Sequence, residues 1–305
     1  MNKLTKLLNI KYPIIQGAMA WISESGLVSA VCNAGGTGAI ASGGRTANWV
    51  KEEIVKTKKL TDKAFGVNIM LMADNVDEII DVVCSEKVAF VTLGAGNPVP
   101  HFEKFHENGI MCIPVVPSLK LAKRVEEKGA DAVIVEGSEA GGHIGSISTM
   151  SHMTNIIPYI DIPVIIAGGI ADGRGIAAAL LMGASGVQLG SRFMLASEAV
   201  IHEKAKAMII NATDTDTVVT GITKGHGVRG LKNEFTSKYL KLEFEGGHRE
   251  EMSAISKGTN RIGVVEGETE KGIIQVGQSL LPLDKIESVS EIIEGLVSET
   301  REALD

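Results

Sequence analysis

Short apolar segments recur along the first two-thirds of the chain, and stretches of mixed polarity separate them. The segment at residues 163–167 is apolar at every position, as strands buried on both faces of a sheet usually are. The other segments are equally short and strand-like. The pattern predicts eight strands, which begin near Pro13, Gly38, Phe65, Val88, Met111, Ala132, Pro163 and Gly186.

Most of the stretches between these strands have the spacing of amphipathic helices, most clearly at residues 47–58, 74–84, 100–108 and 119–128. Eight strand–helix units in about 200 residues are typical of an α/β protein with a (β/α)8 barrel, the TIM barrel. A doubly wound open sheet is the alternative. The regular number of units and the phosphate-type loops after the last two strands favour the barrel.

The pattern changes near the end of the eighth unit. We expect residues 1–196 to form the barrel core and the polar, less periodic residues 197–277 to form a small helical lid beside its mouth. Residues 278–305 would supply a closing segment and a C-terminal helix, because residues 284–304 are apolar at helical spacing. No linker rich in Pro or Ser separates the lid, so a second independent domain is not expected.

The active site of such a barrel lies at the C-terminal ends of its strands. The most informative of these ends runs from Glu136 to Gly145, where small residues lead to His143. Glycines let a flat ligand approach the backbone closely, and a histidine can hold or release a proton near neutral pH. His143 is therefore the candidate catalytic residue, although a loop histidine satisfied by a backbone carbonyl is the simpler alternative.

The loops after the seventh and eighth strands, residues 167–173 and 188–192, are typical of phosphate-binding loops in these barrels. Asp172 is interpreted as the N-cap of the following helix and not as a catalytic acid. Residues 36–41 match the dinucleotide pattern GxGxxA, but a helix-like stretch precedes them and a strand follows. This segment is therefore expected to be a tight helix–strand turn.

Composition excludes several classes of protein. The chain has 305 residues and a net charge of −7, which argues against a basic nucleic-acid-binding surface. Cys32, Cys84 and Cys112 lack CxxC spacing, so a disulfide framework and a zinc site are disfavoured and a cytoplasmic protein is expected. No segment has the pattern of a signal peptide or a membrane span.

Other motifs carry less information. No HExxH, P-loop or Ser-His-Asp pattern is legible, so no metal site is predicted. The basic residues 56–59, with Lys63 nearby, form either a solvated face or a docking point for an acidic partner. The run around His226, Arg229 and Lys232 is open to three interpretations: phosphate binding, shaping of the lid, or a solvated loop.

Seven segments together resemble the FMN-dependent enoyl-acyl-carrier-protein reductase II family, within the wider nitronate monooxygenase-like group of barrels. The resembling segments are residues 12–21, 65–70, 94–98, 113–118, 136–145, 166–173 and 188–193. The resemblance extends from about residue 4 to the C-terminal helix and is weakest between residues 200 and 270. Ala18, where the family often has Gly, is a departure.

The resemblance implies an FMN site at the barrel mouth, with His143 facing the substrate above the flavin ring. Its ring side would be formed by Gly17, Ala18, Met19, Ala140 and Gly141, with Asn68 at the polar edge of the ring and Glu136 beside them. The ribityl chain and the phosphate would be held by Gly168, Gly169, Gln188, Gly190 and Ser191, and Gln278 would belong to a segment that closes over the flavin.

The resemblance also implies an activity. NADH or NADPH would reduce the FMN and leave, and an enoyl thioester on acyl carrier protein would then accept the hydride. His143 would polarise the thioester carbonyl or order a proton-donating water. Two alternatives remain: a nitronate monooxygenase that uses oxygen, with the same histidine as a base, and a non-catalytic barrel that binds flavin or phosphate. A homodimer is an open alternative to a monomer.

Overall fold

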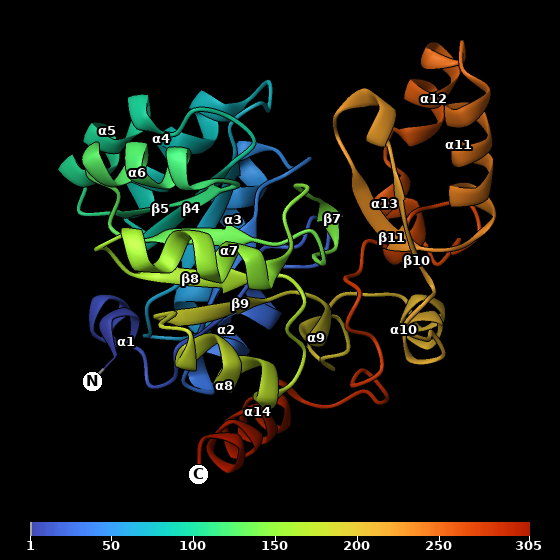
Figure 1. Ribbon diagram of the computed structural model, residues 1–305. Coiled ribbons are helices and arrows are strands. Elements are labelled where there is room, and N and C mark those ends of the chain that lie inside the picture. Colours follow the sequence, from blue (N-terminus) through green and yellow to red (C-terminus); the bar gives the residue numbers. More distant parts are fainter. Residues whose placement is uncertain (1) are drawn as a thin grey trace.

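The computed structural model describes residues 2–305, and its parallel strands close into a barrel in which the first strand pairs with the last. The barrel strands are β1 (Ile14–Gln16), β2 (Thr37–Ala41), β3 (Gly66–Met70), β4 (Phe90–Gly94), β5 (Met111–Val116), β6 (Val133–Glu136), β8 (Val164–Ala167) and β9 (Gly186–Leu189). All eight predicted strands are present, and the predicted TIM barrel of the α/β class is confirmed (Figure 1).

Helices connect the strands and cover the outside of the barrel. They are α2 (Ser25–Asn33), α3 (Ala47–Leu60), α4 (Val76–Glu86), the 3-10 turn η1 (Val99–His101) with α5 (Phe102–Glu107), α6 (Leu119–Glu127), α7 (Thr149–Ile156), 3-10 turn η2 (Ile157–Tyr159), α8 (Gly173–Leu181) and α9 (Ser191–Met194). The predicted N-cap is confirmed, because the Asp172 carboxylate accepts from the Gly175 N–H at the start of α8. The prediction of a turn over residues 36–41 was only partly right: the turn between α2 and β2 lies at residues 34–36, and residues 37–41 form β2 itself.

The C-terminal helix α14 (Val289–Leu304) packs against α8 and α2. It begins later than the predicted residue 284, because Ser288 and Glu291 form a capping box that sets the first helical turn at Val289. Among residues 2–305, no helix combines the length and the apolar character that crossing a bilayer requires.

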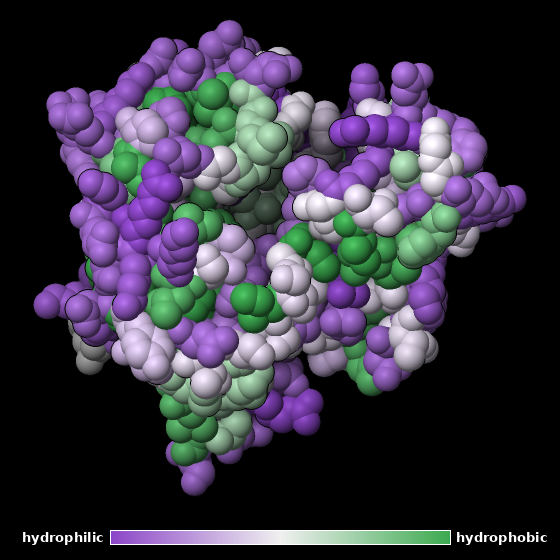
Figure 2. All heavy atoms as spheres, turned by 45° about the horizontal axis from the view of Figure 1, so that its top comes forward, coloured by the Kyte–Doolittle hydropathy of each residue, from purple (hydrophilic) through white to green (hydrophobic). Residues whose placement is uncertain are grey.

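The lid lies beside the barrel mouth and contains both helices and strands. Its elements are α10 (Glu203–Ile210), β10 (Thr217–Thr220), the 3-10 turn η3 (Ile222–Lys224), β11 (Val228–Leu231), α11 (Glu234–Glu245), α12 (Arg249–Ser256) and α13 (Thr259–Val264). The expectation of a helical lid was incomplete, because β10 and β11 form an antiparallel hairpin. Figure 2 shows a hollow between the barrel and the lid, with hydrophobic residues around it.

Beyond the hairpin, β11 pairs with β7 (Gly142–His143), a two-residue strand in the loop after β6. The lid is therefore joined by backbone hydrogen bonds to the loop that carries His143. On the other side of the mouth, the Asn260 amide of α13 donates to the Ala20 carbonyl at 3.0 Å. These contacts hold the lid over the C-terminal ends of the strands.

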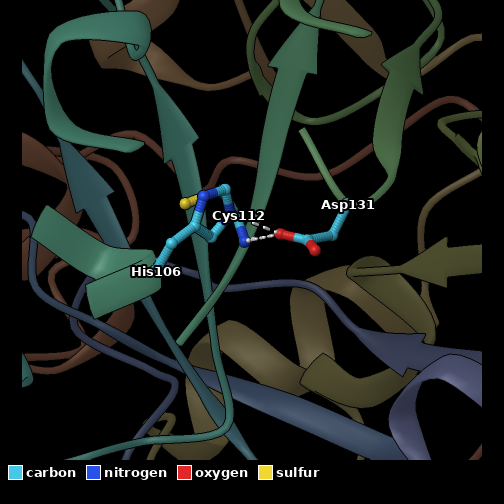
Figure 3. A group of neighbouring side chains, drawn as sticks. All are labelled: His106, Cys112 and Asp131. Atoms are coloured by element: carbon cyan, nitrogen blue, oxygen red, sulfur yellow. Dashed lines mark hydrogen bonds and ion pairs between the residues drawn. The ribbon is translucent and has the colours of Figure 1, made fainter. Parts of the chain in front are cut away.

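A cluster of potential metal ligands lies near the N-terminal ends of β5 and β6, away from the mouth. His106, Cys112 and Asp131 bring three potential ligand atoms within 4.8 Å of one another (Figure 3). Asp131 Oδ2, however, accepts from the Cys112 backbone N–H at 2.7 Å and lies 3.0 Å from His106 Nε2. Burial also raises the pKa of the Cys112 thiol far above its ordinary value. The carboxylate thus ties α5, β5 and the approach to β6 together.

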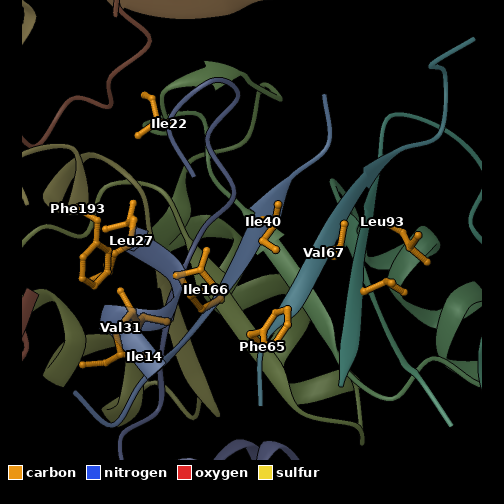
Figure 4. Packing of buried hydrophobic residues seen from close by; sticks show 14 of the residues in the cluster. Ile14, Ile22, Leu27, Val31, Ile40, Phe65, Val67, Leu93, Ile166 and Phe193 are labelled. Carbon is orange, nitrogen blue, oxygen red and sulfur yellow. The ribbon is translucent and has the colours of Figure 1, made fainter. Parts of the chain in front are cut away.

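Two apolar layers explain why the strands appear as continuous apolar runs in the sequence. Ile134 packs with Ile15, Ile113 and Ile165 in one buried cluster, which also includes Leu4 of α1 (Lys3–Leu8). The neighbours of these strand residues along the chain pack in a second, larger cluster (Figure 4). Because successive side chains of a strand point to opposite faces, the first cluster fills the barrel and the second lies between the strands and the helices.

Candidate active site

A pocket opens at the C-terminal ends of β1, β6, β8 and β9, with about 580 Å³ of empty space that includes the part open to solvent. The predicted cofactor residues that line it are Gly17, Ala18, Met19, Glu136, Ala140, Gly141, Gly168, Gly169, Gln188, Gly190 and Ser191. The structure therefore brings together residues from four separate loops that the sequence analysis grouped.

Three predicted residues do not line this pocket: Asn68, Gln278 and His143. The Asn68 amide donates to Thr92 Oγ1 at 2.9 Å, next to the end of β3. The lining residues that the sequence analysis did not name as cofactor contacts are Glu139, Ala167, Ile170, Ala171, Gly277 and Ser279. The first four lie within the segments 136–145 and 167–173 that the motifs singled out, and the last two flank the predicted Gln278.

The β8 loop presents backbone donors to the pocket. Gly168 and Gly169 adopt φ values of +86° and +72°, a region that favours glycine. In the described chain, no protein acceptor pairs with the backbone N–H groups of Gly169, Ile170 and Ala171. Successive free N–H groups of this kind form a concave site for an anion such as a phosphate.

A short segment after the lid crosses the pocket and joins three of its loops. The Gly277 N–H donates to Ser191 Oγ at 2.9 Å, the Gln278 N–H to the Glu139 carbonyl at 2.9 Å, and Ser279 Oγ to the Gly169 carbonyl at 2.8 Å. Gln278 therefore acts through its backbone N–H, which joins this segment to the β6 loop without lining the pocket itself. These bonds hold the β6, β8 and β9 loops in one arrangement.

Two carboxylates, Glu136 and Glu139, lie at the pocket in different environments. Both Glu139 oxygens accept from the Thr149 N–H, at 2.9 and 3.0 Å, so that this side chain caps the start of α7. Glu136 is half-buried at the end of β6, and burial raises its pKa to about 7. A carboxyl group with this pKa exchanges its proton near neutral pH, as active-site acids often do.

His143 lies on β7, where it is paired in register with Val228 of the lid strand. The residue is exposed to solvent, yet neighbouring protein atoms still desolvate its imidazole. This desolvation, and secondly the nearby charge of His226, lower the pKa of His143 below its usual value. The imidazole is therefore neutral at pH 7 and carries one N–H donor and one acceptor nitrogen.

The loops after β1 and β2 are joined by a stack of aromatic and cationic side chains. The Arg45 guanidinium lies 4.1 Å from the ring centroids of both Trp21 and Trp49, and Arg261 of α13 lies 5.5 Å from Trp21. Cation–π contacts of this kind are favourable within about 6 Å. Because Trp21 is close in sequence to Met19, the stack connects the lid to the pocket wall.

Comparisons with known proteins agree with this architecture. The sequence profile of the nitronate monooxygenase family matches residues 1–82 and 70–299. The chain is 32% identical to a (3aS,4S,5R,7aS)-5-hydroxy-7a-methyl-1-oxo-octahydro-1H-indene-4-carboxyl-CoA dehydrogenase of Rhodococcus jostii (strain RHA1), with 99% of this chain and 96% of the relative covered. It is 34% identical to a probable nitronate monooxygenase of Staphylococcus saprophyticus, with 80% and 82% covered.

Solved structures extend these similarities to three dimensions. FabK from Thermotoga maritima matches with a TM-score of 0.97 and 43% identity, covering 100% of this chain and 97% of that one. The nitroalkane oxidase from Streptomyces ansochromogenes matches with a TM-score of 0.87 and 26% identity, covering 99% and 98%. The sequence-based resemblance is thereby confirmed: the chain is an oxidoreductase that belongs to the nitronate monooxygenase family and resembles its FabK branch.

Proposed function

We propose that this chain is an FMN-dependent enoyl-acyl-carrier-protein reductase, which uses NADH or NADPH to reduce the 2,3 double bond of an enoyl thioester in fatty-acid synthesis. The observation that carries this choice within the family is the 43% identity to FabK over the full chain. The relative named as a carboxyl-CoA dehydrogenase supports a thioester as the class of substrate.

The pocket fits FMN in two respects. Its free backbone N–H groups at residues 169–171 suit a phosphate, and Glu139, the carboxylate next to Gly169, is engaged by the Thr149 N–H. A Cβ atom added at Gly190 would meet only the Met19 side chain, at 3.8 Å and beyond, so that this wall leaves space for a ligand. Bound FMN would supply hydride transfer between the nicotinamide and the substrate.

The residues of this chain would bind, orient and move a proton. The β8 and β9 loops would hold the phosphate end of the cofactor, and residues 277–279 would keep the loops in place around it. His143, as a neutral imidazole, would donate a hydrogen bond to the thioester carbonyl or order a water that protonates the α-carbon. A hydrogen bond to that oxygen stabilises the enolate that forms when the β-carbon accepts a hydride.

The mouth, and not the basic cluster at residues 56–59, is where a carrier protein would have to deliver the thioester. These lysines lie near the C-terminal end of α3, which returns from β2 to the opposite end of the barrel. Lys56 and Lys58 also pair with Glu53 and Glu86, at 2.7 and 2.9 Å. We therefore favour the solvated-face interpretation of this cluster over a role in carrier docking.

The test is the consumption of NADH and NADPH by the FMN-loaded protein without oxygen, with and without a short enoyl thioester. We expect sustained consumption only when the thioester is present, and the nucleotide that supports it is the co-substrate. Presenting the thioester on coenzyme A and on acyl carrier protein distinguishes the carrier. Consumption that stops after one flavin equivalent would contradict the proposal.

Nitronate monooxygenase activity is the second candidate, because the family profile and the S. saprophyticus relative carry that name. In that reaction His143 would act as a base towards a nitroalkane, and oxygen would accept the electrons. The electron donor distinguishes the two activities, because the oxidation of an alkyl nitronate needs no pyridine nucleotide. Oxygen uptake with a nitronate, in the absence of NADH and NADPH, would favour this candidate.

Replacing Gly190 with leucine is expected to abolish FMN binding while the protein stays folded. Gly190 has φ of −109°, which any residue can adopt, and its missing side chain leaves space towards Met19. A leucine side chain would therefore occupy ligand space without straining the backbone. FMN fluorescence titration and thermal melting of the apoprotein measure the two effects. Gly26→Leu, at an exposed position of α2, is the matched control.

A further inference from the structure

An arginine from the lid is buried beneath the loop that leads to His143. Arg229 of β11 is 8% exposed. Its Nε and Nη2 donate to the Ser138 carbonyl at 3.2 and 3.1 Å, and its Nη1 donates to Thr217 Oγ1 at 3.0 Å. Over residues 2–305, no carboxylate oxygen lies within 4.0 Å of this guanidinium. A buried charge with only neutral partners is costly, so a function is expected to retain it.

The contacts of Arg229 control the shape of one wall of the pocket. Ser138 is followed by Glu139, Ala140 and Gly141, which line the pocket. The same lid strand also pairs with the next two residues, Gly142 and His143. The side chain of Arg229 and the backbone of β11 therefore hold both ends of this loop, one beside the cofactor pocket and one at the candidate catalytic histidine.

The charge of Arg229 lies against the β6 loop, one residue before Glu139 in the pocket lining. An arginine stays protonated in proteins, even though burial lowers the pKa of this guanidinium. The negative charge of Glu139 partly offsets this lowering of the Arg229 pKa, although the Glu139 oxygens already accept from Thr149. In a poorly hydrated environment a positive charge stabilises negative charge that develops nearby. Reduction of a bound flavin would add negative charge to the pocket, and a nearby cation would favour the reduced state.

We infer that Arg229 is a positioning residue that shapes the β6 loop for the flavin and, through its buried charge, raises the flavin's affinity and reduction potential. The inference rests on the proposed function, because it requires FMN to be the ligand of the pocket. It assigns a role to the run around His226, Arg229 and Lys232, for which the sequence left three interpretations open. That role is a structural and electrostatic one, and not the binding of a phosphate by the arginine.

Three variants separate the hydrogen bonds from the charge. Arg229→Met removes both, Arg229→Lys retains the charge with a different donor geometry, and Thr217→Val removes only one hydrogen-bond acceptor. Arg124→Met, at an exposed position of α6, is the matched control. The measurements are the FMN dissociation constant of the apoprotein, the midpoint potential of the bound flavin and the melting temperature of the apoprotein.

We expect Arg229→Met to weaken FMN binding by about tenfold or more, the usual effect of losing hydrogen bonds to a charged group, and to lower the midpoint potential. Arg229→Lys should keep the wild-type potential while binding FMN more weakly. Thr217→Val should weaken FMN binding by a smaller factor, and Arg124→Met should change neither quantity.

Wild-type affinity and potential in a folded Arg229→Met protein would overturn the inference. If that variant does not fold, wild-type FMN affinity and potential in both Arg229→Lys and Thr217→Val would overturn it, because the hydrogen bonds of Arg229 have been altered in each. Failure of the wild-type apoprotein to bind FMN is a different result. It would contradict the proposed function itself, whereas unaltered FMN binding by the variants contradicts only the role of Arg229.

Discussion

Replacing His143 with alanine lowers the turnover of an enoyl thioester by about 10²–10⁴-fold, the usual contribution of a positioned acid or base, and leaves FMN bound. FMN is expected to stay bound because His143 lies on β7, outside the cofactor pocket. Turnover is expected to fall because His143 is a neutral imidazole. It alone among the candidate residues combines access to solvent with a donor and an acceptor nitrogen.

The measurement is steady-state turnover with the preferred nicotinamide, together with the visible spectrum of the purified variant. His248→Ala, in the lid near the start of α12, is a control that should retain activity. Loss of bound flavin in His143→Ala would assign the residue to the cofactor site instead, and unchanged turnover would remove it from the mechanism altogether.

A variant of the neighbouring His226 is expected to shift the pH profile of turnover. Its charge lowers the pKa of His143, so removing it in His226→Ala raises that pKa. If turnover requires neutral His143, activity falls as the pH drops through this pKa. The acidic limb of the pH profile should therefore move to higher pH in His226→Ala. An unmoved limb would mean that another group controls it.

Replacing Glu136 with glutamine stabilises the apoprotein at alkaline pH and has little effect near pH 4.5. The folded-state pKa of Glu136 is raised to about 7 from an ordinary value of 4.5. Below pH 4.5 the carboxyl group is protonated in both the folded and the unfolded state. As the pH rises from 4.5 to 7, the unfolded state releases its proton first, so the free energy of unfolding falls; above pH 7 the loss is complete.

The size of this effect follows from linkage. A loss of about 1.4 kcal/mol per pH unit over that interval gives up to about 3 kcal/mol, which is large for one surface-accessible pocket residue. Urea unfolding of the apoprotein at pH 5 and pH 8.5 measures the difference between wild type and Glu136→Gln. Glu107→Gln, at an exposed position of α5, is the control. A stability difference that does not grow with pH would contradict the raised pKa.

The barrel could be predicted from the sequence because its strands are buried on both faces. Strands such as β6 and β8 are apolar at nearly every position, and each observed strand begins within two residues of its predicted start. Once the strands were located, so were their C-terminal ends, and most of the pocket residues lie there. Apolar runs and glycine-rich turns are local properties, so a single sequence is sufficient to recognise them.

The lid and the electrostatics of the site depended on tertiary structure. The strand β7 has only two residues, and its partner β11 lies more than eighty residues later, so no local pattern predicts their pairing. In the sequence Arg229 is one basic residue in a polar run, whereas in the fold it is buried against Ser138. The raised pKa of Glu136 likewise comes from desolvation by its surroundings. The sequence by itself determined the barrel, the position of its mouth and the candidate His143, because these follow from short-range patterns. Only the tertiary structure decided which distant residues surround each group, and these neighbours determine its burial, its charge and its hydrogen bonds.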